Sequence, residues 1–211
     1  MAIVETSFLS ESTSKHQRTI QLPSGKEHLV KPNQIIVWLS ITPKVPARGT
    51  PPADSPVFPA ILDTGCGTCL YMTEEQFDYA RRPHDDGYCH LRQTTVNGEP
   101  ADIIMADAWL YRQSSPAHIG TFNLKNPVRL SLREGVRVRV AGSKSKEMPP
   151  KAWFARGRRN PEVAWSQPLP TLGLEVFPVN CLALQMEGFA RKVKILLQPR
   201  GHSLPEPTDR V

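Results

Sequence analysis

The apolar segments of this sequence are short, and prolines and glycines separate them. The chain has 211 residues with 21 prolines and 13 glycines, and residues 43–56 alone contain five prolines. Because proline lacks a backbone donor and restricts φ, this spacing argues against a helical bundle and predicts many loops. No apolar stretch approaches the roughly 20 residues that a membrane-spanning helix requires. We therefore expect a globular protein that makes no contact with a membrane.

Short runs rich in β-branched and aromatic residues predict the strands. The clearest run is residues 34–41, which lies between Pro32 and Pro43. A second apolar run, residues 57–62, ends at Asp63. Further strands are expected at residues 18–22, 103–111, 181–186 and 192–198. Several short strands with little helix predict a mostly β fold, arranged as a partly closed barrel or a sandwich.

Turn and capping residues locate one helix and two hairpins. Thr73 and Gln76 match a capping box, which predicts one short helix that ends near Arg81. The pair Asn97-Gly98 predicts a tight hairpin. In residues 128–141, Val and Leu alternate with polar residues on both sides of Glu134-Gly135. This pattern predicts a second hairpin with one apolar and one cationic face.

A single main domain over residues 33–198 is expected from these segments. Residues 1–32 are polar and are expected to form a loose N-terminal arm, and residues 199–211 a mobile tail. The first 18 residues are charged and lack the apolar core of a secretory signal. We therefore expect a cytoplasmic protein, whose four cysteines are thiols or metal ligands and not a disulfide framework.

The most informative motif is Asp63-Thr64-Gly65, because an apolar strand carries its carboxylate directly into a glycine turn. An Asp before a Gly is also common as a structural turn residue that bonds its own loop. Further along the chain, Thr171-Leu172-Gly173-Leu174 provides an apolar pair around a glycine, and two strand-like runs follow it.

Together these motifs resemble those of the retropepsin-like aspartic proteases, and most closely the short, single-lobe bacterial type. Residues 63–72, which run from the Asp-Thr-Gly to an apolar pair, fit the active-site loop of that family. The order of elements also agrees: strand, Asp-Thr-Gly, short helix, hairpins, apolar-Gly and closing strands. The resemblance covers about residues 34–198 and is specific at the two motifs only. Cys66 stands where Ala or Ser is usual, Gly67 where a polar residue often fixes the loop, and the span from Gly65 to Gly173 is long.

The resemblance implies a fold, an activity and a set of site residues. The fold is the closed barrel of an acid-protease lobe, with one short helix and long loops. The activity is that of an aspartic endopeptidase acting on a peptide or protein, with no metal and no cofactor. Asp63 is implied to be catalytic, the Thr64 hydroxyl to bond across to a partner loop, and Gly65 to permit the turn. Leu172 and Gly173 are implied to support that loop.

This chemistry uses two carboxylates that share one proton, and the chain supplies only one such motif. The alternatives Asp54, Asp85 and Asp86 lack the preceding apolar strand and the following Thr or Ser and Gly. We therefore expect a homodimer in which each subunit provides one Asp63. By chain order, the flap that covers the substrate is expected at residues 95–108, with the predicted hairpin at 128–141 as the alternative.

Three other interpretations remain open from the sequence. In the first, the retropepsin-like fold serves for association and has no catalytic activity. In the second, Cys66 and Cys69 form a Cys-x-x-Cys that binds zinc together with His84, Cys89 and His90, or acts as a redox pair. In the third, the basic residues 124–160 bind nucleic acid with the help of Trp153, Phe154 and Trp165. That segment carries eleven Lys or Arg against two Glu, but no nucleic-acid-binding signature accompanies it, and we do not expect nucleic acid as a partner. Outside the zinc interpretation, His84, His90, His118 and His202 are expected to be solvated and not catalytic.

Overall fold

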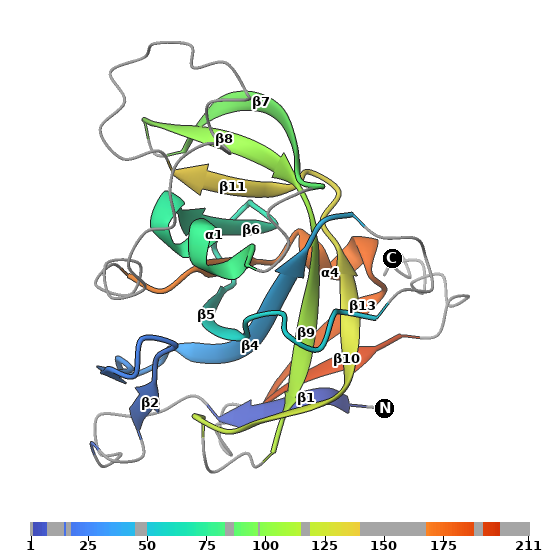
Figure 1. Cartoon of the computed structure of the whole chain (residues 1–211). Helices are drawn as coiled ribbons and strands as arrows, with labels where there is room; N and C mark the ends of the chain where they lie inside the picture. The colour runs from blue at the N-terminus through green and yellow to red at the C-terminus, as the bar shows by residue number, and fades with distance from the viewer. Residues whose placement is uncertain are drawn as a thin grey trace, which may run out of the picture.

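A computed structural model of the chain describes residues 2–7, 15, 18–44, 50–82, 87–96, 98–114, 119–139, 168–187 and 192–198 (Figure 1). These residues form fourteen strands and two helices. The first half of the chain contains β1 (Ala2–Ser7), β2 (Thr19–Gln21), β3 (Glu27–Leu29), β4 (Ile35–Thr42), β5 (Phe58–Asp63), β6 (Leu70–Thr73), α1 (Glu74–Ala80) and β7 (Cys89–Val96). The second half contains β8 (Glu99–Met105), β9 (Asp107–Gln113), β10 (Phe122–Ser131), β11 (Val136–Arg139), β12 (Thr171–Gly173), α4 (Val176–Val179), β13 (Leu182–Glu187) and β14 (Lys192–Leu197). The fold is therefore mostly β, as the sequence predicted.

Nine strands form the main sheet, in the order β10-β9-β4-β5-β12-β6-β11-β8-β7. Its end strands β10 and β7 do not pair with each other, so the closed barrel expected from the sequence is wrong for the described part of the chain. Both end strands carry register shifts, and β10 also contains Pro127, which has no backbone N–H to donate. These features interrupt the hydrogen bonding of both edge strands and so disfavour pairing between them. The prediction of one helix was also incomplete, because the described residues contain a second helix, α4.

The terminal segments form a separate sheet, in the order β1-β14-β13. The hairpin of β13 and β14 confirms the two strands predicted near the C-terminus. β1 was not predicted, and it pairs with β14 along the opposite side from β13. The sequence of β1 lacks a clear apolar alternation, and its place in the sheet depends on a partner at the other end of the chain. Residues 199–211, predicted to be a tail, lie outside the described residues.

Strand β4 lies at the centre of the fold, and all eight of its residues are buried. The face of β4 that carries Ile35, Val37, Leu39 and Ile41 is buried in the main apolar core. On the other side Trp38 packs with Trp109 and Tyr111 of β9 in a second cluster. Burial on both faces explains why this run is continuously apolar and does not alternate.

Helix α1 starts with the capping box expected from the sequence. The Gln76 backbone N–H donates to the Thr73 side chain at 3.3 Å, and the Gln76 side chain accepts from the Thr73 backbone N–H at 3.0 Å. The helix ends at Ala80, one residue before the predicted end. Neither this helix nor α4 has the length or the apolar character that a membrane span needs, and no other helix occurs among the described residues.

The predicted hairpin at residues 128–141 is wrong. The chain does turn at Gly135, whose φ is +77°, but β10 then pairs with β9, whereas β11 pairs with β6 and β8. An added Cβ at Gly135 would lie 2.6 Å from the Ile104 carbonyl oxygen, so this turn packs directly against β8. Leu130 of β10 and Val136 and Val138 of β11 are buried and Val128 is partly buried, but the two strands pair with different neighbours. The alternation of apolar and polar residues predicted both strands correctly, but it gave no information on which strands they pair with.

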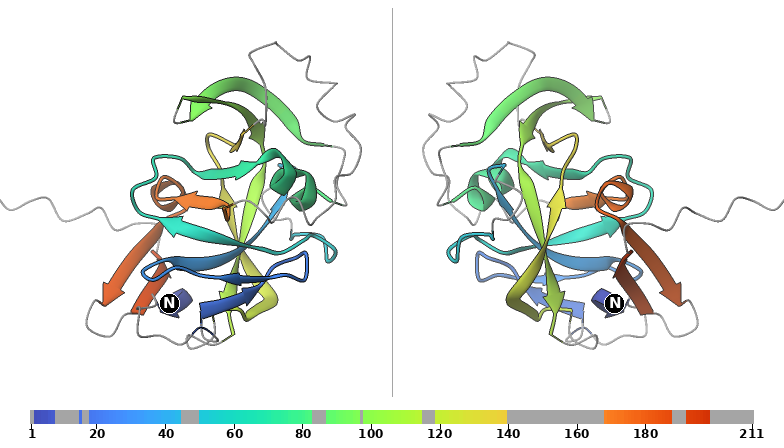
Figure 2. Two further views of the ribbon diagram at one scale, coloured as in Figure 1. Left: turned by 90° about the vertical axis from the view of Figure 1, so that its left-hand side faces the viewer. Right: turned by 90° about the vertical axis from the view of Figure 1, so that its right-hand side faces the viewer.

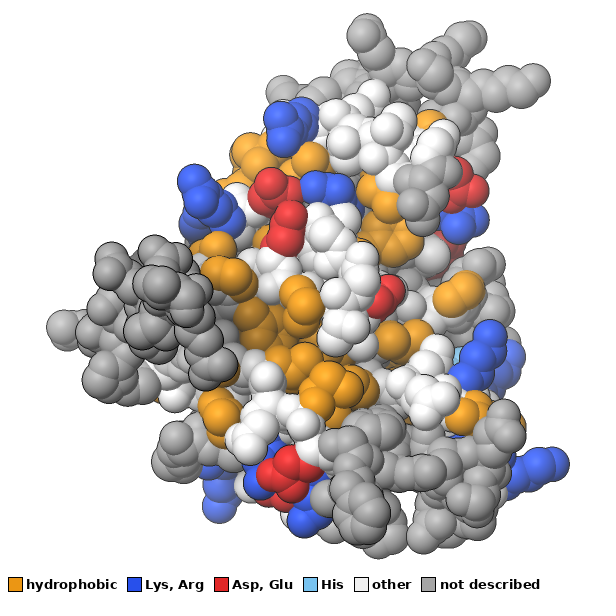
Figure 3. Space-filling view, turned by 180° about the vertical axis from the view of Figure 1, so that it is seen from behind, with side chains coloured by type: hydrophobic (Ala, Val, Ile, Leu, Met, Phe, Trp, Pro, Cys, Tyr) orange, Lys and Arg blue, Asp and Glu red, His pale blue; other side chains and the backbone are white. Residues whose placement is uncertain are grey.

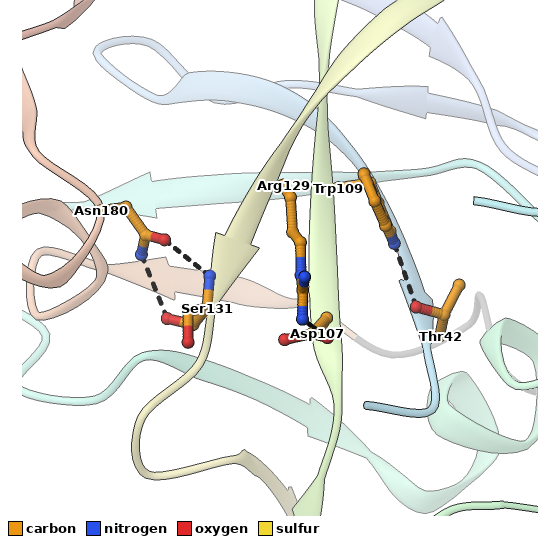
Figure 4. A network of polar contacts seen from close by, with 6 residues as sticks. All are labelled: Thr42, Asp107, Trp109, Arg129, Ser131 and Asn180. Carbon is orange, nitrogen blue, oxygen red and sulfur yellow. Dashed lines mark hydrogen bonds and ion pairs between the residues drawn. The ribbon is translucent and has the colours of Figure 1, made fainter. Parts of the chain in front are cut away.

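Polar contacts hold β10 in this position (Figure 4). The Arg129 guanidinium donates to the buried carboxylate of Asp107 at 2.7 Å, which joins β10 to β9. The Asn180 side chain, which follows α4, accepts from the Ser131 N–H at 2.6 Å and donates to the Ser131 carbonyl at 3.1 Å. The same side chain donates to the Val176 carbonyl at 2.7 Å, so α4 is tied to the end of β10.

Candidate active site

Asp63 is the last residue of β5, in the middle of the main sheet. β5 is hydrogen bonded to β4 on one side and to β12 on the other, and Gly173 of β12 lies opposite Asp63. The preceding Leu62 is buried in the core, which anchors the strand directly before the carboxylate. The sheet therefore presents an exposed Asp63 at the end of a fully supported strand.

The turn after β5 holds the Asp63 carboxylate by a local hydrogen bond. The Gly65 backbone N–H donates to Asp63 Oδ1 at 2.8 Å, and the Cys66 backbone N–H donates to the Asp63 carbonyl at 3.3 Å. The Cys66 Sγ and the Thr68 Oγ1 lie 3.1 Å apart within the same loop. Such a turn fixes one carboxylate oxygen and leaves the other available, since an ionised carboxylate accepts several hydrogen bonds.

Gly173 fits closely against this loop from a distant part of the chain. An added Cβ at position 173 would lie 1.9 Å from the Thr68 carbonyl oxygen and 2.5 Å from that of Cys66. The Gly173 N–H also donates to the Cys69 carbonyl at 3.1 Å. Leu172 is buried in the core directly before it. The structure thus brings together the five predicted site residues, Asp63, Thr64, Gly65, Leu172 and Gly173.

The top of the turn is open to solvent. Asp63, Thr64 and Gly65 are all exposed, and within the described ranges the Asp63 carboxylate bonds only to its own turn. The Thr64 hydroxyl has no hydrogen bond to any described residue. Asp54, an alternative acid, lies in an exposed turn before β5, and Asp85 and Asp86 lie outside the described residues. Among the described residues, one chain therefore provides one exposed carboxylate at this site.

A row of side chains crosses the sheet beside Asp63, and sequence reasoning did not identify it. Ile61 is paired with Thr171, Thr171 with Tyr71, and Tyr71 with Arg137. All four are partly exposed, and Ile61 lies on the same face of β5 as Asp63, because alternate residues share a face. Burial raises the pKa of the Tyr71 hydroxyl, whereas its hydrogen bond to Arg139 acts in the opposite direction. Only the strand order, which local patterns do not encode, would have revealed this row.

The hairpin of β7 and β8 projects as an arc from the end of the sheet (Figures 1 and 2). Its turn contains Gly98 with a φ of +80°, in agreement with the predicted Asn97-Gly98 hairpin, although Asn97 itself is outside the described residues. At the base of the hairpin, His90 Nε2 lies 3.0 Å from Oδ1 of the buried Asp102. The predicted flap at 95–108 includes this turn, all of β8 and the start of β9. The alternative flap at 128–141 is excluded, because its described part, residues 128–139, contains two strands that pair with different neighbours and not with each other.

The cysteines of the Cys-x-x-Cys differ in their surroundings. Cys69 is buried, and burial raises the pKa of its thiol, as do the carboxylates of Glu175 and Glu134. Cys66 is partly exposed and Cys89 is exposed. In the ranges that the structure describes, no three Cys, His, Asp or Glu side chains are grouped as metal ligands, and His84 falls outside those ranges.

The basic segment at residues 124–160 is described only as far as Arg139. Three of its arginines make ion pairs: Arg129 with Asp107 at 2.7 Å, Arg137 with Glu134 at 2.7 Å, and Arg139 with Glu99 at 2.9 Å. The cationic face is thus partly neutralised within the fold. The aromatic residues Trp153, Phe154 and Trp165, and also His118 and His202, lie outside the described residues.

Comparison of the chain with protein-family models, with curated proteins and with solved structures found no match in any of the three.

Proposed function

We propose that this chain is one subunit of a homodimeric, retropepsin-like aspartic endopeptidase. Each subunit contributes one Asp63, and the two carboxylates meet at a two-fold axis between the subunits. The observation that carries the proposal is the Asp63 turn itself. An exposed carboxylate follows a buried strand, its Oδ1 accepts from the Gly65 N–H, and Gly173 packs against the carbonyls of the same loop.

The exposure of this turn favours a dimer. A single carboxylate does not supply the acid and the base that peptide hydrolysis needs, and two close carboxylates share one proton because both cannot ionise together. The exposed Thr64 hydroxyl has no partner in the described part of its own chain, so it is available to a second subunit.

In the proposed mechanism the ionised Asp63 of one subunit removes a proton from water, and the resulting hydroxide attacks the scissile carbonyl carbon. The protonated Asp63 of the other subunit donates its proton to the carbonyl oxygen, which gives a tetrahedral diol. The first Asp63 then passes the proton taken from water to the amide nitrogen, and the C–N bond breaks to release the amine. One hydroxyl of the diol returns a proton to the second Asp63 as the carboxylic acid product forms, so the pair regains its single shared proton. The two side chains titrate as one pair, so the pH dependence of cleavage reports macroscopic pKa values of the pair.

The row from Ile61 to Tyr71 is the proposed substrate surface. It lies on the face of the sheet that carries Asp63 and combines an aliphatic, a hydroxyl and an aromatic side chain. The hairpin of β7 and β8 is the proposed flap, because it projects from the sheet and has an exposed glycine turn. An extended peptide between the two would be shielded from water during reaction.

The decisive experiment compares the wild-type protein with Asp63→Asn on a diverse peptide library, read by mass spectrometry between about pH 4 and 7. Asn still accepts a hydrogen bond from the Gly65 N–H, so the turn is preserved while the titrating group is lost. Asp54→Asn is the matched control, because Asp54 is also an exposed turn aspartate. We expect cleavage by the wild type and by the control, and none by Asp63→Asn.

Identical cleavage by Asp63→Asn would refute the catalytic role of this residue. No cleavage by the wild type at any of these pH values, at concentrations where it is dimeric, would instead favour the fold as an association module.

A further inference from the structure

The row of side chains beside Asp63 continues past Tyr71 to β7, the last strand of the main sheet. Arg137 of β11 is paired with Ile103 of β8, and Ile103 is paired with Arg92 of β7. Residues that are paired directly across neighbouring strands point to the same face of a sheet, so these three residues share the face that carries Asp63. The proposed substrate surface therefore has a basic end, which reaches onto the β7–β8 hairpin.

A β-bulge places Arg92 on this face. The pairing of β7 with β8 shifts between His90 and Arg92, so Leu91 is the extra residue of the bulge. If the register of His90 with Ile104 continued, Arg92 would lie opposite Asp102, on the other face of the sheet. Bulges are frequent next to active sites, where they redirect a side chain. Here the redirected side chain is a cation.

Arg92 and Arg137 keep hydrogen-bond donors that the described part of the fold does not use. Arg92 is exposed and forms no ion pair with any described residue. The Arg137 side chain is 20% exposed and donates from Nη2 to Glu134 at 2.7 Å, but its buried Nε has no acceptor among the described residues. Arg139, the next residue on this face of β11, is instead paired with Glu99 at 2.9 Å. Two guanidinium groups on this face are thus available to an anionic ligand.

The buried side chain of Ile103 lies between the two arginines. Two strand spacings, about 9–10 Å, separate the backbones of Arg92 and Arg137. Two arginine side chains are long enough to close on one carboxylate across that gap, and guanidinium donors match the two oxygens of a carboxylate in geometry. An anion bound there would lie between two positive charges and beside an apolar side chain, where attraction between charges is stronger than in bulk water.

Charged side chains are also visible at this end of the molecule from behind. Strands β7, β8 and β11 lie at the top of Figure 1, and Figure 3 shows the molecule turned about the vertical axis. The upper part of Figure 3 carries Lys or Arg side chains next to acidic ones, whereas hydrophobic side chains gather across the middle. This end is therefore suited to recognition of a ligand by its charge.

We propose that Arg92 and Arg137 bind an acidic side chain of the peptide substrate, and so determine specificity for Asp or Glu at a position away from the scissile bond. Four strand spacings, at most about 20 Å, separate β5 from β8 in the main sheet. An extended peptide crosses that distance with about six residues, so the acidic residue lies within about six residues of the scissile bond. The inference rests on the proposed function, because it takes the ligand to be a peptide that reaches Asp63.

The test measures peptide binding by fluorescence anisotropy, with the full chain carrying Asp63→Asn so that no peptide is consumed. The probes are two matched sets of labelled peptides of about twelve residues, in which one Glu or one Gln occupies each position in turn. At one position we expect the Glu peptide to bind at least about tenfold more tightly than its Gln counterpart, because only the carboxylate forms charge-assisted hydrogen bonds with the arginines.

The variants Arg92→Gln and Arg137→Gln, made in the same background, should each reduce this preference at least about fivefold. Glu134→Gln is the matched control, because it breaks the same ion pair as Arg137→Gln but keeps the guanidinium group. It should bind the Glu peptide at least as tightly as the parent protein, whereas a purely structural role of the ion pair would make both variants weaker. Lys125→Gln removes an exposed positive charge from β10, at the opposite end of the sheet, and should have no effect. Circular dichroism confirms that each variant is folded.

Equal binding of the two peptide sets, including no binding of either, would overturn the proposal, as would a Glu preference that both arginine variants retain. A single-stranded oligonucleotide that binds more tightly than any Glu peptide, and is lost in both arginine variants, would also overturn it, since the arginines would then bind phosphate groups. Catalysis is judged separately with the wild type: a Glu preference without cleavage supports this site and contradicts the proposed protease. Cleavage that shows no preference for Asp or Glu near the scissile bond does the reverse.

Discussion

The shape of the Asp63 turn depends on one residue far along the chain. The Gly65 N–H bond to Asp63 is local, and any sequence that allows the turn would form it. The close approach of Gly173 to the carbonyls of Cys66 and Thr68 is not local, because it requires β12 to lie beside β5. Backbone atoms are the obstacle to a side chain at position 173, so no rotamer change relieves the contact.

Gly173→Ala is therefore expected to destabilise the protein by about 1–3 kcal/mol or more, the usual cost of overpacking a core. The added methyl group would meet the Thr68 and Cys66 carbonyl oxygens, so the loop that carries Asp63 must shift. Urea unfolding followed by circular dichroism measures the free energy of unfolding.

Gly67→Ala is the matched control in the same loop, since an added Cβ there would meet nothing within 4 Å. Its free energy of unfolding should stay within about 0.5 kcal/mol of the wild-type value. Equal stabilities for the two variants would show that the tight packing at Gly173 is not required.

Among the secondary-structure elements, turns and helix caps were predicted more reliably than the strands that pair with each strand. The capping box at Thr73 and the Asn97-Gly98 turn depend on a few adjacent residues, and both appear where the sequence predicts them. The run at 103–111 is instead divided between β8 and β9 at Ala106, because the chain changes neighbours there from β11 to β4. Local apolar patterns do not register such a change.

The corner between β10 and α4 offers a prediction about one connection between elements. Asn180→Ala removes three hydrogen bonds, and it leaves the Ser131 N–H and carbonyl without their partner. A fully buried polar group without a partner costs about 1–3 kcal/mol, but Ser131 and Asn180 are only partly buried, so we expect a loss of stability of about 1 kcal/mol. The midpoint of urea unfolding gives the change.

Asn123→Ala serves as the comparison, because the Asn123 side chain accepts only from the exposed Lys125 N–H within β10. A change of less than about 0.5 kcal/mol is expected there. If Asn180→Ala changed the free energy of unfolding as little as Asn123→Ala does, the hydrogen bonds between Asn180 and β10 would not stabilise the fold.

For the whole molecule, the central prediction is that one active site belongs to two subunits. Wild-type protein is mixed with an equal amount of refolded Asp63→Asn subunits, at a concentration that keeps both dimeric. Random pairing leaves roughly half of the wild-type subunits in mixed dimers with a single aspartate. Cleavage per wild-type subunit should therefore fall to about half, as measured by the initial rate on one fluorogenic peptide.

The same mixture made with Asp54→Asn subunits should show no such loss, because those subunits keep the proposed catalytic group. A rate that stays at the full wild-type value in the Asp63→Asn mixture would show that each subunit acts alone.

Local sequence patterns were sufficient to predict the mostly β class, the positions of most strands, the capping of α1 and the Asp-Thr-Gly turn. These features depend on residues that are close together in the chain, such as apolar alternation, prolines at boundaries and a glycine beside a carboxylate. The strand order could be known only from the folded chain: β12 lies between β5 and β6, β11 lies between β6 and β8, and the end strands of the main sheet do not pair with each other. Strand pairing joins distant segments through backbone groups that every residue carries, so the side-chain pattern of one strand does not specify its neighbours.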